Sequence, residues 1–66
     1  MKKVVEFDNI PDVKGKPLHL KVTRQDDGRY SMSVSLINPN GQRHGLLYCW
    51  LTHAQVQAIA DLAEAP

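Results

Sequence analysis

Three residues near the C-terminus, His44, Cys49 and His53, are of types that could support nucleophilic or metal chemistry. A thiolate beside an imidazole is a common nucleophile, and the same side chains bind transition metals. Alternation along a strand predicts that His44 and Cys49 point to opposite faces. Cys49 also lies between aromatic and aliphatic neighbours, where a thiol is usually an inert small hydrophobe. The sequence therefore predicts no catalytic residue, no metal site and no cofactor.

A second candidate for ligand chemistry is Lys14-Gly15-Lys16, which could contact a phosphate. A solvated polar loop explains the same residues more simply. The sequence holds no glycine-rich phosphate loop, no paired carboxylates and no nucleophile motif elsewhere. We interpret the protein as non-enzymatic, without a small-molecule substrate.

Length and composition limit the size of the fold. With 66 residues, 42% of them hydrophobic, the chain is predicted to form one small domain over residues 1–66. A core of this size supplies only about 3–5 kcal/mol of net stability. The single cysteine excludes an intrachain disulfide, and no residue set offers the four ligands of a structural zinc site. Oligomerisation or docking on a partner is therefore an expected source of stability.

The N-terminal segment begins with basic residues, as a signal peptide does. Glu6 and Asp8 interrupt the apolar run that a signal peptide needs. No stretch approaches the roughly 18 apolar residues that cross a bilayer. A lone Cys49 within an apolar run is typical of a reducing compartment. We expect a cytoplasmic protein that does not act at a membrane.

Alternating polar and apolar residues predict two strands, residues 18–25 and 30–37, joined by a tight turn at Asp27-Gly28. A short strand is expected before them at 4–7. Its connection to the next strand is residues 10–17, because two prolines and a glycine interrupt that segment.

Asn38-Pro39-Asn40-Gly41 predicts a second hairpin turn. The strand that follows, residues 44–51, is apolar on both faces, with Tyr48 and Trp50 on one face and Cys49 on the other. A strand of this kind is usually covered on both sides. The sequence leaves open which of its faces is buried.

Thr52 is a favourable N-cap and Gln55 completes a capping box, so a helix is predicted over about residues 53–63. Helical spacing gathers apolar residues on one face and polar residues on the other. The apolar residues are Val56, Ile59, Ala60 and Ala63, with Leu62 beside them, and the polar ones are His53, Gln57, Asp61 and Glu64. The predicted fold class is α+β: a small antiparallel β-meander of three to four strands, with one C-terminal α-helix packed on the sheet.

Charge is unevenly distributed along the chain. Seven of the eight basic residues and five of the seven acidic ones lie between Lys2 and Arg29, whereas Arg43 is the only charged residue from Tyr30 to Ala60. Polar uncharged side chains can be covered without the desolvation cost of an ion. The second half of the chain therefore presents either a contact surface or a chance depletion of charge.

The two-faced fourth strand favours a contact surface, with large aromatics as its strongest contributors. The candidate binding residues are Tyr48, Trp50, Arg43, His44, His19, Lys21 and Ser33. The alternative is that Trp50 fills the core. The leading hypothesis is a small accessory regulator or inhibitor, of the kind that a phage or mobile element encodes. It would dock its sheet on a protein partner or on itself as a homodimer.

Four strands and a final helix, with Pro39-Asn40-Gly41 before the last strand and Leu51-Thr52 leading into His53-Ala54-Gln55-Val56, resemble the transcriptional positive-coactivator family of single-strand DNA-binding proteins. The resemblance covers about the last forty residues and implies a ββββα fold that binds single-stranded nucleic acid. The residues expected to make such contacts are Lys21, Arg24, Arg29, Tyr30 and Trp50. Nucleic acid is the second hypothesis, because the net charge is only +1 and the third strand carries serines.

Overall fold

The computed structural model describes residues 3–64, in which four strands precede one helix. The elements are β1 (Lys3–Pro11), β2 (Pro17–Arg24), β3 (Tyr30–Ile37), β4 (Arg43–Leu51), α1 (His53–Asp61) and a 3₁₀ turn, η1 (Leu62–Glu64). Met1 and Lys2, which begin the basic N-terminal segment, and Pro66, expected beyond the helix, lie outside the described residues. The predicted α+β class and its element order are confirmed.

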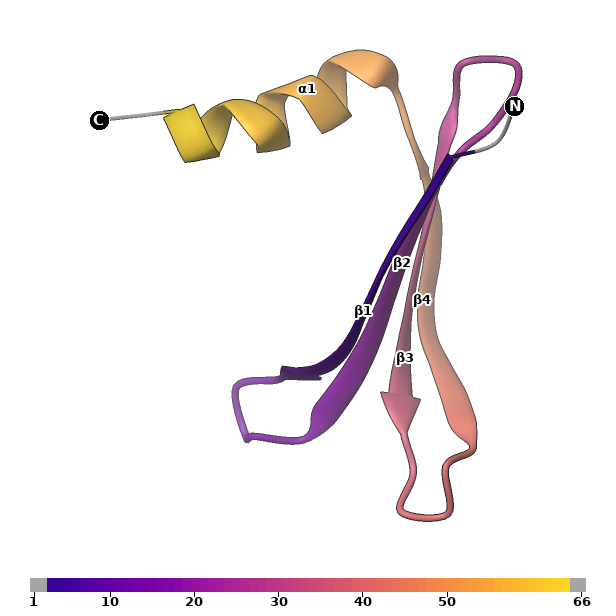
Figure 1. The fold of residues 1–66 in the computed structure, drawn as a ribbon, viewed down its shortest axis with the longest axis vertical. Helices are drawn as coiled ribbons and strands as arrows, with labels where there is room; N and C mark the ends of the chain where they lie inside the picture. The colour runs from indigo at the N-terminus through magenta and orange to yellow at the C-terminus, as the bar shows by residue number, and fades with distance from the viewer. Residues whose placement is uncertain (1–2, 65–66) are drawn as a thin grey trace.

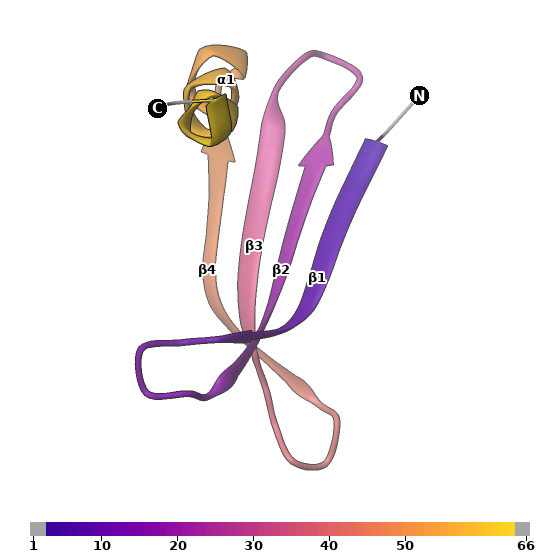
Figure 2. The ribbon, with the colours of Figure 1, turned by 60° about the vertical axis from the view of Figure 1, so that its left-hand side comes forward.

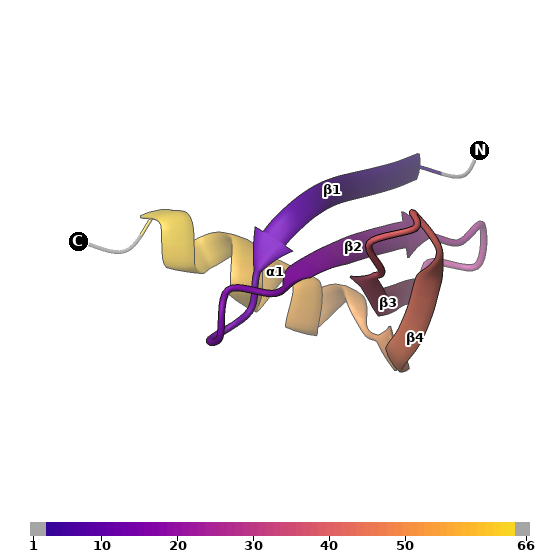
Figure 3. The ribbon, with the colours of Figure 1, turned by 90° about the horizontal axis from the view of Figure 1, so that it is seen from below.

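The strands form one antiparallel sheet in the order β1-β2-β3-β4, in which each strand pairs with its neighbours in sequence. Figure 2 shows the four strands side by side, and Figure 3 shows the curvature of the sheet from below. The turn between β2 and β3 and the turn between β3 and β4 each contain a glycine in the left-handed region. Gly28 has φ 88° and Gly41 has φ 86°. Both turns therefore follow the predicted chemistry.

β1 is longer than the sequence predicted, because it continues to Pro11 instead of ending at residue 7. Its pairing with β2 shifts register between Phe7 and Ile10, where Asn9 takes a positive φ of 60°. This bulge lets the strand pass an irregular segment and resume pairing. Phe7 and Ile10 consequently face the same side, opposite Leu20 and Leu18 respectively.

A second bulge lies in β4, where the register with β3 shifts between Val34 and Ser35. Ser35 pairs with Gly45 and Val34 with Leu47, so the alternation is interrupted at Leu46. The expectation that His44 and Cys49 point to opposite faces is wrong, because the extra residue restores them to one face. They remain five positions apart on a strand that rises about 3.3 Å per residue, too far for a thiolate–imidazole pair.

The helix begins at the predicted cap. Thr52 Oγ1 accepts a hydrogen bond from the backbone N–H of Gln55 at 3.2 Å, and Gln55 Oε1 accepts one from the N–H of Thr52 at 2.9 Å. The two bonds complete the capping box. The regular helix ends at Asp61, two residues earlier than expected, and the last turn tightens to η1.

The structure differs from the prediction in the placement of this helix. Figure 1 shows α1 leaving the end of β4 and running away from the strands. No residue of α1 or η1 is buried, so the helix does not lie on the sheet of its own chain. Between residues 3 and 64 the one buried hydrophobic side chain is Tyr30, which is 9% exposed. The described chain is a single layer without the covered core that the sequence predicted.

Candidate functional site

One face of the sheet is apolar from β1 to β4. Cross-strand partners in a sheet share a face, so the registers assign each residue to a side. The apolar face consists of Val5, Phe7 and Ile10 from β1, Leu18, Leu20 and Val22 from β2, Tyr30, Met32, Val34 and Leu36 from β3, and Leu47, Cys49 and Leu51 from β4. Apart from Tyr30, every one of these is exposed or half-buried. An apolar surface that extends over four strands is larger than a soluble monomer normally leaves open.

Tyr30 is the point where this face meets the helix. Its hydroxyl lies 3.0 Å from Nδ1 of His53, and the two ring centroids are 5.9 Å apart. Because Tyr30 pairs with Leu51, the helix starts on the apolar side, at the end of the sheet where β4 stops and β3 begins.

The charged residues of the apolar face lie along that same end of the sheet, on β1 and β2. Lys3 of β1 pairs with Arg24 of β2, which pairs in turn with Tyr30. Neither cation forms an ion pair within residues 3–64. The apolar face is therefore bordered by two uncompensated positive charges.

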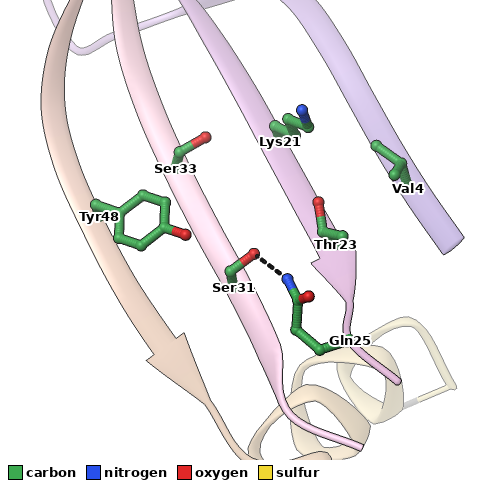
Figure 4. Close-up of a pocket in the computed structure, with 7 residues that line it drawn as sticks. All are labelled: Val4, Lys21, Thr23, Gln25, Ser31, Ser33 and Tyr48. Carbon is green, nitrogen blue, oxygen red and sulfur yellow. Dashed lines mark hydrogen bonds between the residues drawn. The ribbon is translucent and has the colours of Figure 1, made fainter. Parts of the chain in front are cut away.

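The opposite face is polar in its centre and aromatic along β4. His19, Lys21 and Thr23 of β2 lie beside the three serines of β3, and Tyr48 and Trp50 pair with Ser33 and Ser31. Figure 4 shows a shallow depression of about 330 Å³ on this face, lined by Val4, Lys21, Thr23, Gln25, Ser31, Ser33 and Tyr48. Gln25 Nε2 donates to Ser31 Oγ at 3.2 Å across its floor.

Trp50 is half exposed and has two aromatic or cationic neighbours. The Arg29 guanidinium carbon lies 4.6 Å from the Trp50 ring centroid, and Tyr48 meets the same ring edge-on at 6.2 Å. Arg29 also donates from Nε to Asp27 Oδ2 at 2.8 Å. The backbone and side-chain hydrogen bonds from Arg29 hold the pKa of Asp27 below its ordinary value. The contacts with Asp27 thus favour the placement of Arg29 beside the indole.

A polar network connects β1, β2 and β4 at the other end of this face. His19 is 3% exposed, and its Nδ1 lies 2.7 Å from Asp8 Oδ1. Since an ionised carboxylate can only accept, Nδ1 of His19 carries the proton. Arg43 approaches the same oxygen at 3.7 Å. The sheet is curved enough to bring β1 and β4 together here although they are not neighbours.

The structure brings together most of the predicted binding residues. Tyr48, Trp50, Arg43, His19, Lys21 and Ser33 all lie on the polar face, whereas His44 pairs with Leu36 on the apolar face. Trp50 is not a core residue within the described chain, because half of it is exposed.

The predicted nucleic-acid contacts are divided between the faces. Lys21, Arg29 and Trp50 belong to the polar face. Arg24 and Tyr30 belong to the apolar face, and Tyr30 is buried against the helix. The structure therefore does not assemble the five residues into one surface.

The apolar face was not among the predicted candidate sites. It was expected to form the intramolecular core, since a C-terminal amphipathic helix usually covers the sheet that precedes it. The only signal against that assignment was the single residue, Thr52, between β4 and α1. A one-residue connection leaves the chain no room to turn back across the sheet.

Chemical sites are not evident in the part of the chain that the structure describes. Residues 3–64 contain no cluster of His, Cys, Asp or Glu that could hold a metal ion. Within the same residues, no helix has the length and apolar character needed to cross a membrane.

Comparisons with known protein families, with curated proteins and with solved structures give no match. The resemblance to the coactivator family accordingly remains an expectation.

Proposed function

We propose that the protein is a small non-enzymatic binding protein that docks the apolar face of its sheet on a second copy of itself. The uncovered apolar face carries this proposal. A sheet with one polar and one apolar face is stable in water only when its apolar face is covered. Because this chain does not cover its own apolar face, a partner that covers it would stabilise the fold. An accessory regulator or inhibitor of this kind would act as a homodimer with both polar faces outward.

The shape of the apolar face fits such an interface. It extends across four paired strands of eight or nine residues each, which gives it both length and width. A symmetric dimer also needs a self-complementary patch, and an apolar sheet face meets that requirement because apolar contacts are not directional.

The test compares two neighbouring valines of β1. Val5 lies on the apolar face and is 52% exposed, whereas Val4 lies on the polar face and is 49% exposed. By sedimentation or light scattering, the wild type should have twice the 7.4 kDa mass of the chain. Val5→Asp should shift it to the monomer, and Val4→Asp should leave the dimer intact. A wild type that stays monomeric at high concentration, or equal behaviour of the two variants, overturns the proposal.

A second candidate function is binding of single-stranded nucleic acid on the polar face. The arrangement of Arg29 over Trp50, with Tyr48 beside it and Lys21 nearby, favours it, since bases stack on exposed aromatic rings next to cations. The two functions are compatible, because they use opposite faces.

Trp50 is the sole tryptophan, so its fluorescence tests this candidate directly. An unstructured oligothymidylate should quench the emission at low salt, with affinity falling as salt rises. Arg29→Ser should weaken binding, and Arg24→Ser on the other face should not. Unchanged emission at low salt would remove the nucleic-acid function.

A further inference from the structure

We propose that the helix of each copy covers the apolar sheet face of the other, and that its acidic end contacts the partner's Lys3 and Arg24. This inference rests on the self-association proposed above and names what occupies the face. Its components are a helix with an uncovered apolar stripe, an uncovered sheet face and two sets of charges without ion pairs among residues 3–64, although Asp61 accepts a hydrogen bond from Gln57.

The apolar stripe of the helix is largely uncovered in the described chain. Ile59 is 57% exposed and Leu62 74%, and Val56 is only half-buried. Alanines at 58, 60 and 63 surround this stripe and permit close approach to another surface. An amphipathic helix of nine residues is not stable alone in water, because helices this short depend on tertiary packing. The stripe therefore needs a partner surface.

The chain's own sheet is not that surface. Only Thr52 separates β4 from α1, and the capping box fixes the direction in which the helix leaves. The hydrogen bond between Tyr30 and His53 holds the first turn at the end of the sheet, while the rest of the helix runs outward (Figure 1). Folding the helix back onto the sheet would separate His53 from Tyr30 and break this bond.

A second copy related by a two-fold axis would cover both the apolar stripe of the helix and the apolar face of the sheet. With the two apolar faces opposed, each helix projects from its own sheet toward the other. A two-fold axis perpendicular to the helices makes them antiparallel, so that the C-terminal end of one would lie near the start of its mate. That start lies beside Tyr30, at the end of the sheet where Arg24 and Lys3 follow on the next two strands.

The charges at these two positions are complementary. The end of the helix carries Asp61 and Glu64 and no basic residue. Carboxylates are unfavourable at the negative end of a helix dipole, and cations there are favourable. The partner's Arg24 and Lys3 would supply these cations, and they lack ion pairs within residues 3–64 of their own chain.

Charge reversal tests the proposal in the full-length protein. One variant carries Lys3→Glu and Arg24→Glu, and the other carries Asp61→Lys and Glu64→Lys. Each alone places like charges at the contact, so its homodimer should weaken about tenfold or more. Mixed together, the two variants should form a heterodimer of nearly wild-type affinity, because every contact then joins opposite charges.

The control is Lys14→Glu with Lys16→Glu, which changes the net charge equally but lies in the exposed loop between β1 and β2. It should dimerise like the wild type. A monomeric wild type would contradict the proposed self-association itself. A dimeric wild type whose reversed variants dimerise normally, or whose mixture fails to restore affinity, overturns only the helix contact.

Hydrogen exchange of the wild type gives a second measurement that needs no variant. If the partner's sheet covers the helix, protection of the Val56 and Ile59 amides should rise with protein concentration through the dimerisation range. Helix amides that exchange at one rate across that range, while sheet amides of the apolar face gain protection, overturn the helix contact.

Discussion

The hydroxyl of Tyr30 and Nδ1 of His53 lie 3.0 Å apart, which joins the most buried hydrophobic residue of the sheet to the first residue of the helix. This is the one side-chain hydrogen bond between sheet and helix within residues 3–64. The position of the helix therefore depends on a single polar contact and on the short connection through Thr52.

Tyr30→Phe should remove that contact while keeping the ring. We expect the free energy of unfolding to fall by about 0.5–1.5 kcal/mol, the net value of a typical hydrogen bond. Urea denaturation followed by far-UV circular dichroism measures it. Tyr48→Phe serves as the control, because Tyr48 is exposed on the other face and should change stability much less. Equal losses in the two variants would show that the Tyr30 hydroxyl does not secure the helix.

Thr52→Ala should remove the side-chain half of the capping box. The N–H of Gln55 then loses its acceptor, and N-cap substitutions of this kind cost about 1 kcal/mol. If the helix forms part of the dimer contact, the same substitution should also weaken dimerisation, since a frayed helix must be ordered before it docks. Chemical denaturation measures the loss of stability, and sedimentation over a concentration series measures the loss of dimer affinity. Thr52→Ser, which keeps the hydroxyl, should restore both to near their wild-type values.

Local features of this fold were predictable from the sequence, and the longer-range ones were not. Alternation predicted β2 and β3, and Gly28, Gly41 and the Thr52 cap marked where elements end, because each depends on neighbouring residues alone. The bulges at Asn9 and Leu46 depend on how two strands pair, which alternation within one strand does not contain. The placement of the helix depends on the chain's surroundings, so the capping box predicted where it begins but not what it covers.

The candidate surfaces, too, were predictable where they depend on neighbouring residues and not where they depend on strand pairing. Tyr48 and Trp50 were expected to act together, and they share a face. Residues two positions apart on a regular strand point to the same side, and the β4 bulge lies before both of them. His44 was expected beside them, and the β4 bulge moved it to the other side. Arg24 and Tyr30 were grouped with Lys21 by charge and ring chemistry alone. Lys21 and Arg24 lie three positions apart on β2 and so point to opposite faces, and Tyr30 pairs with Arg24.

The pKa of Asp27 should lie below its ordinary value because the Arg29 backbone N–H and guanidinium both donate to it. A carboxyl whose pKa is lowered on folding stabilises the native state above its unfolded pKa. That contribution is lost as the pH falls through the folded pKa. Arg29→Ala should raise the pKa part of the way, since the backbone donor remains. Carboxyl titration by NMR measures this shift, and an unchanged value would assign the whole effect to the backbone.

Gly28 and Gly45 should respond oppositely to alanine. Neither has a neighbour within 4 Å of an added Cβ, so steric contact does not distinguish them. Gly28 has φ 88°, where an L-residue is strained by about 1–2 kcal/mol. Gly45 has no such φ, and alanine there should be neutral or slightly stabilising, since it restricts the unfolded chain. Thermal unfolding of both variants at one protein concentration compares them.

Asp8 and Glu6 of β1 each contact a residue of β2, and the two partners differ in burial. Asp8 accepts from His19, which is 3% exposed, whereas Glu6 lies 3.7 Å from an exposed Lys21. Removing an acceptor from a buried donor costs about 1–3 kcal/mol, and breaking an exposed ion pair costs about 0–1 kcal/mol. Asp8→Ala should therefore destabilise the sheet clearly more than Glu6→Ala. Chemical denaturation measures both, and equal losses would mean that water reaches His19 once Asp8 is removed.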